Sequence, residues 1–326
     1  KMKAIVATAY GNHEVLKLQE VDIPQPKENE ILVKVVNSSA TTADTMMLTG
    51  KPYISRLFMG FKKPKHEIPD TGFAGTVVSA GKNVTLFKKG DDVFGETLFG
   101  FATNAEYISM PENGIVLHKP ENLTFSEAAG FCDGHLTSHN FLQELGEIKP
   151  GQKVLINGAS GSLGTSAVQL AKYFGAEVTG VCSSSNVGLV KSLGADFVID
   201  YTKEDFSELE KEFDIIYDTL GKIPFRKAKK VLASGGLYLS PVLKTGLLFS
   251  MLRTSIAGRK KAQFAATGMK AQGQLKSLLN ELLGIFQSGN LKTIIDRQFP
   301  LEKVAQAHQY IATGHKKGNV VIVVES

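Results

Sequence analysis

The sequence contains few cysteines and no long apolar run. Cys132 and Cys182 are its only cysteines, too few for a disulfide framework or a four-cysteine structural zinc site. We therefore expect a reducing compartment, the cytoplasm. No apolar stretch approaches the roughly 18 residues of a membrane-spanning helix. Residues 1–6 continue directly into a strand-like pattern, so we expect no signal peptide.

Charged and apolar residues occur in ordinary proportions. Hydrophobic residues make up 43% and charged residues 21% of 326 residues, which is typical of a soluble globular chain long enough for two domains. The net charge of +5 includes two basic clusters, at 62–65 and 259–261, and we favour a solvated surface for both. As an alternative, the apolar run 247–252 and the second cluster form a basic amphipathic segment that lies on a membrane surface. No motif supports nucleic-acid binding, and we expect no such partner.

The chain changes character near Pro150. Before it, apolar alternation predicts strands, at 3–8, 30–36, 75–78 and 105–109. After it, strands are expected at 153–157, 177–181, 197–199, 214–217 and 236–240, with helices at 161–174, 186–193, 205–211 and 224–232. A longer helix is expected at 272–288, and a last strand at 320–324 is assigned to the first domain. Such alternation predicts an α/β fold with a parallel sheet covered on both faces.

A glycine-spaced turn follows the first of these strands. The apolar run 154–156 leads into a turn that opens a segment with helical spacing. A dinucleotide pyrophosphate needs this layout, because the backbone must approach the phosphates closely and the helix N-terminus must present free N–H groups. The alternative is an ordinary strand–helix turn. The residues predicted to contact the cofactor here are Gly158, Ser160, Gly161, Ser162, Leu163 and Gly164.

Several further motifs occur in a fixed order along nearly the whole chain. They lie at 73–78 with Gly81, at 87–95, 149–152, 192–196, 199–201, 295–301 and 314–321. Together with the glycine turn, they make the chain resemble the zinc-free medium-chain dehydrogenase/reductases, close to the quinone oxidoreductases. The resemblance implies a Rossmann domain at 122–291, inserted into a β-rich GroES-like domain formed by 1–121 and 292–326. It also implies a cleft between the domains and, commonly, a homodimer.

The resemblance locates the positions at which zinc-dependent relatives bind their catalytic metal. These positions hold Thr41, Thr71 and Asp133, whereas Zn²⁺ prefers thiolate and imidazole ligands. The cysteines of the structural zinc lobe are missing as well. An improvised site is the alternative, from the nearby residues His66, Cys132 and His135. We expect no bound metal.

Without a Lewis acid, oxidation of a simple alcohol is hard to drive. Reduction of an enone or a quinone needs less help, because conjugation spreads the developing negative charge. We therefore expect an NADPH-dependent reductase of quinones or α,β-unsaturated carbonyl compounds. Two alternatives stay open: a zinc-type alcohol dehydrogenase, and a non-enzymatic NADPH-binding protein with a structural or regulatory role.

The loop after the second strand of the expected Rossmann domain selects the cofactor. An NAD site usually has an Asp or Glu there for the ribose 2′-hydroxyl. Here the loop contains Ser183, Ser184 and Asn186, and no acid follows until Asp196, so we expect NADPH. The resemblance adds four cofactor contacts, at Tyr201 near the 2′-phosphoribose, at Lys317, and at Leu220 and Asn319. A strand-end aromatic is the alternative for Tyr201.

The resemblance also suggests residues for catalysis. Thr137 stands where the family has a hydroxyl near the nicotinamide, at the expected start of a helix. Thr41 and Asp44 stand where zinc-free relatives line the substrate pocket. Tyr53 aligns with a tyrosine that faces the substrate and can donate a proton; a packing role is its alternative. Asp133 and His135 either tune the pocket or form a structural pair.

Overall fold

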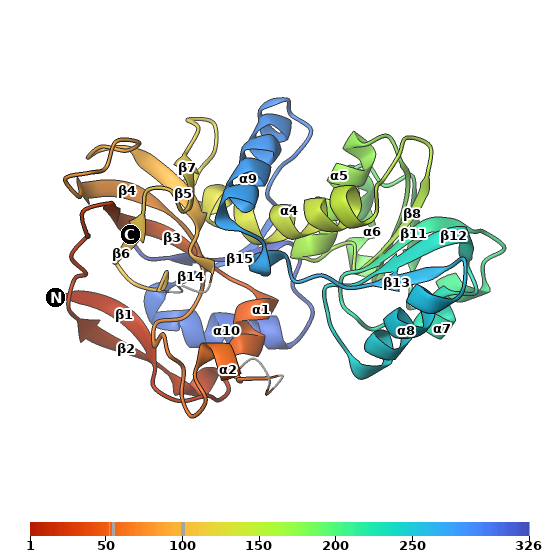
Figure 1. Cartoon of the computed structure of the whole chain (residues 1–326), viewed down its shortest axis with the longest axis horizontal. Helices are drawn as coiled ribbons and strands as arrows, with labels where there is room; N and C mark the ends of the chain where they lie inside the picture. The colour runs from red at the N-terminus through yellow and green to blue at the C-terminus, as the bar shows by residue number, and fades with distance from the viewer. Residues whose placement is uncertain (52, 54–55, 99–101, 326) are drawn as a thin grey trace. The chain divides into compact units, whose positions relative to one another are not determined.

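The computed structural model describes residues 1–51, 53, 56–98 and 102–325 and divides into two compact units. Unit 1 comprises Lys1–Asp133, Ala271–Glu281 and Thr293–Ser326. Unit 2 comprises Gly134–Lys270 and Leu282–Lys292. Figure 1 shows the chain coloured from red at the N-terminus to blue at the C-terminus. The domain boundaries inferred from the sequence, at 121/122 and 291/292, remain a proposal beside this division.

Unit 1 is rich in β-structure. Its described residues form a seven-stranded sheet in the order β14-β15-β3-β4-β5-β7, with β6 also pairing with β3, and a separate β1-β2 hairpin. The strands are β1 (Met2–Ala7), β2 (Leu16–Val21), β3 (Glu30–Ala40), β4 (Gly72–Ala80), β5 (Asp92–Glu96), β6 (Tyr107–Pro111), β7 (Ile115–His118), β14 (Ile295–Pro300) and β15 (Asn319–Val323). β15 pairs antiparallel with β3, so the chain's last strand does return to the first sheet, as predicted.

Several apolar clusters stabilise unit 1, and two of them connect its main elements. Val33, Phe73 and Val93 belong to one cluster on the central strands, because alternate residues of a strand point to the same face. The other joins β15 to helices α1 and α10 through Leu48, Val304 and Val320. The helices of this unit are α1 (Thr42–Leu48), α2 (Arg56–Met59), α3 (Phe125–Ala129) and α10 (Val304–Ala312). α9 (Gln272–Gln287) belongs partly to each unit.

Unit 2 contains a parallel six-stranded sheet in the order β10-β9-β8-β11-β12-β13 within the described residues. The strands are β8 (Lys153–Asn157), β9 (Glu177–Cys182), β10 (Phe197–Asp200), β11 (Phe213–Asp218), β12 (Leu232–Leu239) and β13 (Lys261–Gln263). Numbered from β8, this is the order 3-2-1-4-5-6 of a Rossmann fold. Val154, Leu155 and Ile156 of β8 are all buried, as expected of a central parallel strand. The predicted α/β fold is confirmed.

The helices of unit 2 depart from the sequence prediction in three places. They are α4 (Phe131–His139, which begins in unit 1), α5 (Ser162–Tyr173), α6 (Val187–Ser192), α7 (Phe225–Ala228) and α8 (Thr245–Ile256). The predicted helix at 205–211 is wrong: only a 3₁₀ turn forms at Phe206–Glu208, where the acids at 204, 208 and 212 repel one another at helical spacing. The helix predicted at 224–232 is shorter because β12 begins at Leu232, and α8 was not predicted. No helix in the described ranges is long and apolar enough to cross a membrane.

Candidate cofactor and active site

The glycine turn between β8 and α5 has the backbone geometry that a pyrophosphate needs. Gly158 has a φ of +75°, and a Cβ there would lie 2.6 Å from Oγ1 of Thr219. A Cβ on Gly164 would lie 2.0 Å from the Gly158 carbonyl oxygen, so only glycine lets the helix approach the strand. Gly161 is the N-cap of the 12-residue α5 and brings no side chain, which leaves the first helical N–H groups open to an anion.

Other predicted cofactor residues gather at the same edge of the sheet. Ser160 is buried in the turn, and its Oγ accepts a hydrogen bond of 3.0 Å from Nδ2 of Asn186. The Asn186 amide therefore holds the glycine turn, a role that the sequence did not suggest. Ser162 and Leu163 form the first turn of α5. Leu220, 42% exposed, follows β11 beside Gly158: a Cβ on that glycine would lie 2.7 Å from Cγ of Leu220.

From the sequence we expected no acidic side chain at the loop after β9, but the structure places one there. β10 lies beside β9 and pairs Asp200 with Cys182, which brings a carboxylate to the serine loop. Oγ of Ser184 donates to Oδ2 of Asp200, and Thr202 donates to Oδ1 through both its N–H and its hydroxyl. These hydrogen bonds hold the pKa of Asp200 well below its usual range, and the bond from Ser184 has the largest effect. The premise of an acid-free loop was wrong because it considered one strand end and not its neighbour.

A pocket of about 470 Å³ lies at the carboxyl ends of β8, β9 and β10. Tyr201, which is 58% exposed, and Lys203 line it. Nζ of Lys203 lies 3.4 Å from Oδ2 of Asp200, so a cation faces the carboxylate in this corner. Sequence reasoning missed Lys203, although it lies only two residues after Tyr201, which the family resemblance had singled out. Ser183 stands at the entrance to the serine loop, where its Oγ lies 3.3 Å from Oγ of Ser185.

A buried acid holds the end of β11 in place. Asp218 is fully buried and accepts hydrogen bonds from Nδ2 of Asn157, the hydroxyl of Tyr238 and the N–H of Ile223. It thereby joins the ends of β8 and β11, the two strands at which the order of the sheet reverses and where ligands of such sheets bind. The available signal was an acid directly after the apolar run 215–217, and the sequence analysis did not use it.

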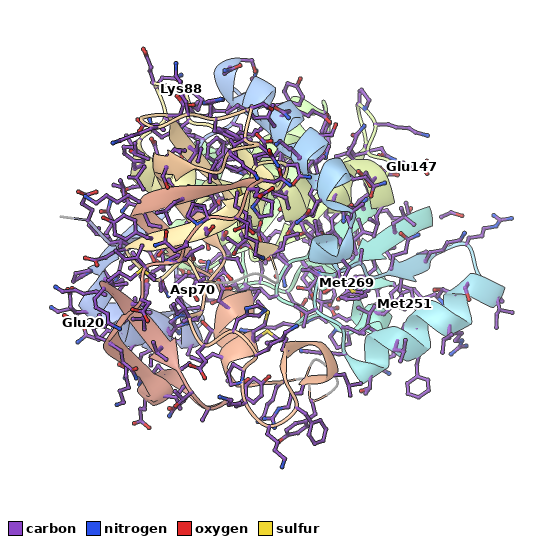
Figure 2. All side chains as sticks on the ribbon, turned by 60° about the vertical axis from the view of Figure 1, so that its left-hand side comes forward. Glu20, Asp70, Lys88, Glu147, Met251 and Met269 are labelled. Carbon is purple, nitrogen blue, oxygen red and sulfur yellow. The ribbon has the colours of Figure 1, made fainter. Side chains whose placement is uncertain are left out.

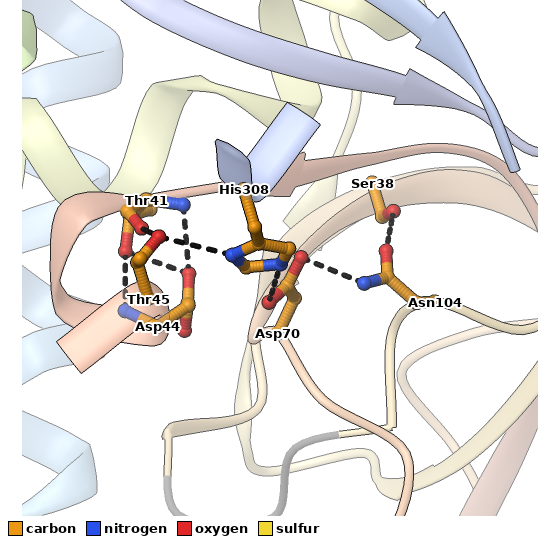
Figure 3. A network of polar contacts seen from close by, with 7 residues as sticks. All are labelled: Ser38, Thr41, Asp44, Thr45, Asp70, Asn104 and His308. Atoms are coloured by element: carbon orange, nitrogen blue, oxygen red, sulfur yellow. Dashed lines mark hydrogen bonds and ion pairs between the residues drawn. The ribbon is translucent and has the colours of Figure 1, made fainter. Parts of the chain in front are cut away.

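In unit 1, the predicted pocket residues Thr41 and Asp44 form a helix cap (Figure 3). Oγ1 of Thr41 donates to Oδ2 of Asp44 over 2.6 Å, and the Asp44 N–H donates back to Oγ1 of Thr41 over 3.0 Å. Both side chains are buried, and Oδ1 of Asp44 has no hydrogen-bond partner. Burial, then the nearby charge of Asp70, raises the pKa of Asp44 well above its usual value.

A second buried pair lies beside this cap. Nε2 of His308 lies 3.3 Å from Oδ1 of Asp70, and Nδ1 lies 2.9 Å from the hydroxyl of Thr45 (Figure 3). Asn104 donates to the other oxygen of Asp70 over 2.7 Å. Asp70 has a φ of +68°, a left-handed conformation that is uncommon outside glycine. Nothing local in the sequence indicated this pair, because Asp70 and His308 lie at opposite ends of the chain.

The remaining predicted residues lie apart from this network. Tyr53 is 67% exposed, and the guanidinium carbon of Arg56 lies 4.8 Å from its ring centroid. Thr137 is half-buried near the middle of the helical stretch 131–145, not at its start, since α4 continues into a π-helical segment. Lys317 and Asn319 are in unit 1: the Lys317 N–H donates to Asp296, and Nδ2 of Asn319 donates to the Ile294 carbonyl.

Thr71 and Asp133, two of the positions at which zinc-dependent relatives bind their metal, lie near an acid that sequence reasoning missed. Oε1 of Glu96 accepts a hydrogen bond from Thr71 over 3.4 Å, and burial together with the charge of Asp133 raises the pKa of Glu96 to about 8. Burial also raises the pKa of the Cys132 thiol and lowers that of His135 to about 3, so this imidazole is neutral. Asp133 and His135 stand two apart on α4 and thus on different faces. Over the ranges described, no group of three or more His, Cys, Asp or Glu side chains could hold a metal ion.

Comparison with known proteins matches two segments of the chain to families of dehydrogenase domains. Residues 27–121 match the family described as alcohol dehydrogenase GroES-like domain, and residues 193–322 match zinc-binding dehydrogenase. The chain is 36% identical to 2-methylene-furan-3-one reductase of Solanum lycopersicum, over 99% of this chain and 79% of the relative. It is 32% identical, over the same shares, to the chloroplastic NADPH-dependent alkenal/one oxidoreductase of Arabidopsis thaliana. The structure of quinone oxidoreductase from Coxiella burnetii superposes with a TM-score of 0.87 at 27% identity, covering 99% of each chain.

Proposed function

Because the chain belongs to the quinone oxidoreductase-like medium-chain dehydrogenase/reductases, we propose that it is an NADPH-dependent reductase of quinones or α,β-unsaturated carbonyl compounds. The chain is thus an oxidoreductase of a family whose relatives include an alkenal reductase and a furanone reductase. The observation that carries the proposal is the Gly158–Gly164 turn. A Cβ on Gly158 would clash with Thr219, and one on Gly164 would clash with the Gly158 carbonyl oxygen, so the chain needs glycine to make a tight turn of the kind that brings a helix N-terminus to a phosphate. Zinc-type alcohol oxidation and a non-enzymatic role stay the alternatives.

The residues of unit 2 fit a dinucleotide in a definite orientation. The N–H groups at the start of α5 would hold the pyrophosphate, and Leu220 would contact the ribose or nicotinamide side of the turn. Lys203, Tyr201 and the serine loop would hold the adenosine end. When bound, the nicotinamide would supply the hydride. These contacts require the backbone to be extended at Gly161, the N-cap of α5, and helical from Ser162 and Leu163 onward.

We infer a preference for NADPH from the balance of charge at the pocket beside β10. The Asp200 carboxylate would repel a 2′-phosphate, but it already accepts three hydrogen bonds from Ser184 and Thr202 and lies beside Lys203. Lys203 is exposed, so its ammonium can turn from Asp200 to a phosphate. Tyr201 offers a hydroxyl at the same edge. The Arabidopsis relative is itself described as NADPH-dependent.

A conjugated acceptor must receive a proton after the hydride. We propose Tyr53 as its donor, because its exposed ring is open to a substrate, with Thr137 near the nicotinamide. Thr41 and Asp44 would act as positioning residues, since Oγ1 of Thr41 and Oδ2 of Asp44 are engaged in the cap of α1. Glu96 is a second candidate donor: with a pKa of about 8 it is mostly protonated at neutral pH. The proposed small-molecule partner is therefore a quinone or an enone. We also propose, from the family resemblance, that the protein forms a homodimer.

The proposal is tested by incubating the purified chain with NADPH and a panel of quinones, enones and saturated aldehydes. Oxidation of NADPH with the conjugated acceptors, and not with the saturated ones, supports it. Metal analysis of the same sample separates it from a zinc-type dehydrogenase, which would retain stoichiometric zinc and oxidise alcohols. Tight NADPH binding without turnover of any acceptor would favour the non-enzymatic alternative.

A further inference from the structure

Helix α8 of unit 2 has an apolar face that points away from the protein. Leu248, Phe249, Leu252 and Ile256 are 45%, 71%, 57% and 88% exposed. At 100° per residue these four side chains share one face of the helix. The opposite face, with Leu247 and Met251, packs on the core of unit 2. An exposed apolar stripe of this size usually marks a surface that contacts another molecule or a membrane.

The stripe lies at the edge of the parallel sheet. β13 is the last strand in the sheet order, and α8 runs beside it with α7 next to α8 (Figure 1). Met251, labelled in Figure 2, marks the inner side of α8. All of these elements belong to unit 2, and no other described element covers the exposed stripe. For the rest of the subsection, this stripe is called the α8 face.

The chain around the α8 face is strongly basic. Between Asp218 and Glu281, the sequence has twelve Lys or Arg residues and no Asp or Glu, and eleven of the twelve lie in unit 2. Three of these eleven form ion pairs, with Asp205, Glu208 and Glu144. The other eight have no carboxylate of the described residues within ion-pairing distance; they are Lys222, Arg226, Lys229, Lys244, Arg253, Arg259, Lys260 and Lys261.

These cations lie close to the apolar stripe. Lys244 is the N-cap of α8, Arg253 lies on the helix, and Arg259 follows its end. Nζ of Lys260 donates to the Lys229 carbonyl, which ties the segment after α8 to the end of α7. The α8 face is therefore an apolar stripe bordered by unpaired positive charge. Apolar side chains that enter an acyl layer, with cations at the headgroup level, are the features of a helix that lies on a membrane.

We propose that the α8 face docks this protein on an anionic phospholipid surface. The charge of the face argues against a second copy of the chain, because a two-fold contact would bring the same cations against one another. A nucleic acid would match the cations but would leave the aliphatic stripe in water. A bilayer matches both: Leu248, Phe249, Leu252 and Ile256 enter the acyl boundary, and the cations face the lipid phosphates. The proposal stands whether or not the proposed reaction is correct.

The test is co-sedimentation of the full chain with lipid vesicles. One set contains neutral phosphatidylcholine, and the other contains in addition about 30% of the anionic lipid phosphatidylserine. We expect binding to the anionic vesicles that exceeds binding to the neutral ones by about tenfold or more, and that falls steeply as salt rises above about 0.1 M.

Two pairs of variants separate the apolar stripe from the charges. The double variant Phe249→Ser, Ile256→Ser should lose most of the binding, at least about tenfold, because acyl contact is removed. Its control, Leu18→Ser with Leu86→Ser, removes two exposed leucines of unit 1 and should bind as the wild type. Arg253→Gln with Arg259→Gln should weaken binding to anionic vesicles alone, whereas Lys62→Gln with Lys89→Gln should not. All of these side chains are exposed, and the salt series on the wild type gives a second measurement that needs no variant.

Three results would overturn the proposal. The first is equal binding of the serine double variant and the wild type to anionic vesicles. The second is a wild-type dimer, measured by light scattering after size exclusion, that this variant converts to a monomer, because the α8 face would then contact a second copy. The third is a duplex nucleic acid that binds while vesicles of either composition do not.

Discussion

The hydroxyl of Ser184 donates a hydrogen bond to the carboxylate of Asp200, across the ends of two neighbouring parallel strands. The carboxylate thus lies beside the loop that would receive the adenosine ribose. Lys203, at 3.4 Å from the same carboxylate, compensates its charge. We propose that a pair of opposite charges at this position sets the selectivity between the two nicotinamide cofactors.

Replacement of Lys203 by Ala should weaken NADPH binding about tenfold and leave NADH binding nearly unchanged. The reason is that only NADPH has a 2′-phosphate for this ammonium, while Asp200 would remain as an uncompensated charge beside it. Fluorescence titration of both cofactors measures the change. The matched control is Lys191→Ala, on α6 of the same unit. Equal losses for NADPH and NADH would show that Lys203 does not contact the phosphate.

The variant Ser183→Asp should reverse the preference. A second carboxylate at the end of β9 would repel the 2′-phosphate and could accept a hydrogen bond from the ribose 2′-hydroxyl of NADH. The wild type is expected to bind NADPH at least about tenfold more tightly than NADH, or about 1.4 kcal/mol. Both dissociation constants are measured in the same titration. Equal affinities in the wild type would refute the NADPH preference at once.

Tyr53→Phe tests the proton donor. The change keeps the ring and removes only the hydroxyl, so turnover of enones should fall by about 10²-fold or more. Quinone reduction should suffer less, because a hydroquinone anion can take its proton from water. Tyr173→Phe, which removes another partly exposed hydroxyl, serves as the control. An unchanged enone rate would give Tyr53 a packing role and leave Glu96, Asp133 or water as the source of the proton.

The raised pKa of Glu96 predicts that the free energy of unfolding depends on pH. Its pKa in the folded protein is about 8, above the ordinary 4.5, so the folded state binds this proton more tightly than the unfolded state. The folded state is then destabilised progressively as the pH rises from about 4.5 to about 8, and Glu96→Gln removes that loss. The free energy of unfolding of the variant, relative to wild type, should thus rise by about 1 kcal/mol or more between about pH 5 and pH 8. Denaturant titrations at both pH values measure it.

A control with an exposed carboxylate makes that comparison specific. Glu20, labelled in Figure 2, is exposed on β2, and Glu20→Gln should change the free energy of unfolding equally at both pH values. If Glu96→Gln behaves in the same way, the partly buried environment of Glu96 does not set its protonation.

Local sequence patterns predicted the fold well because its strands are regular. The glycine turn after 153–157 and the apolar runs that follow it determine the sheet of unit 2 from short segments alone. The contacts that were missed join segments far apart in the chain. Asp200 reaches Ser184 only because β10 pairs with β9, and His308 reaches Asp70 only because α10 packs on the sheet of unit 1.

The helices show a second limit. α8 was not predicted because it is apolar on two faces, and its outward residues Leu248 and Ile256 obscure the helical period that the inward ones follow. At 205–211 the apolar residues Phe206 and Leu209 have helical spacing, but the acids at 204, 208 and 212 would repel one another in a longer helix. In both places the helix prediction failed because of surface residues and not because of core residues.

The central claim is tested most directly by initial rates of NADPH oxidation with a simple enone, a benzoquinone and the matching saturated carbonyl compound. We predict turnover of the two conjugated acceptors, slower turnover with NADH, and rates that do not change when the protein is treated with a metal chelator. Absence of turnover with both conjugated acceptors, in protein that binds NADPH, would contradict the claim, as would chelator-sensitive oxidation of a simple alcohol.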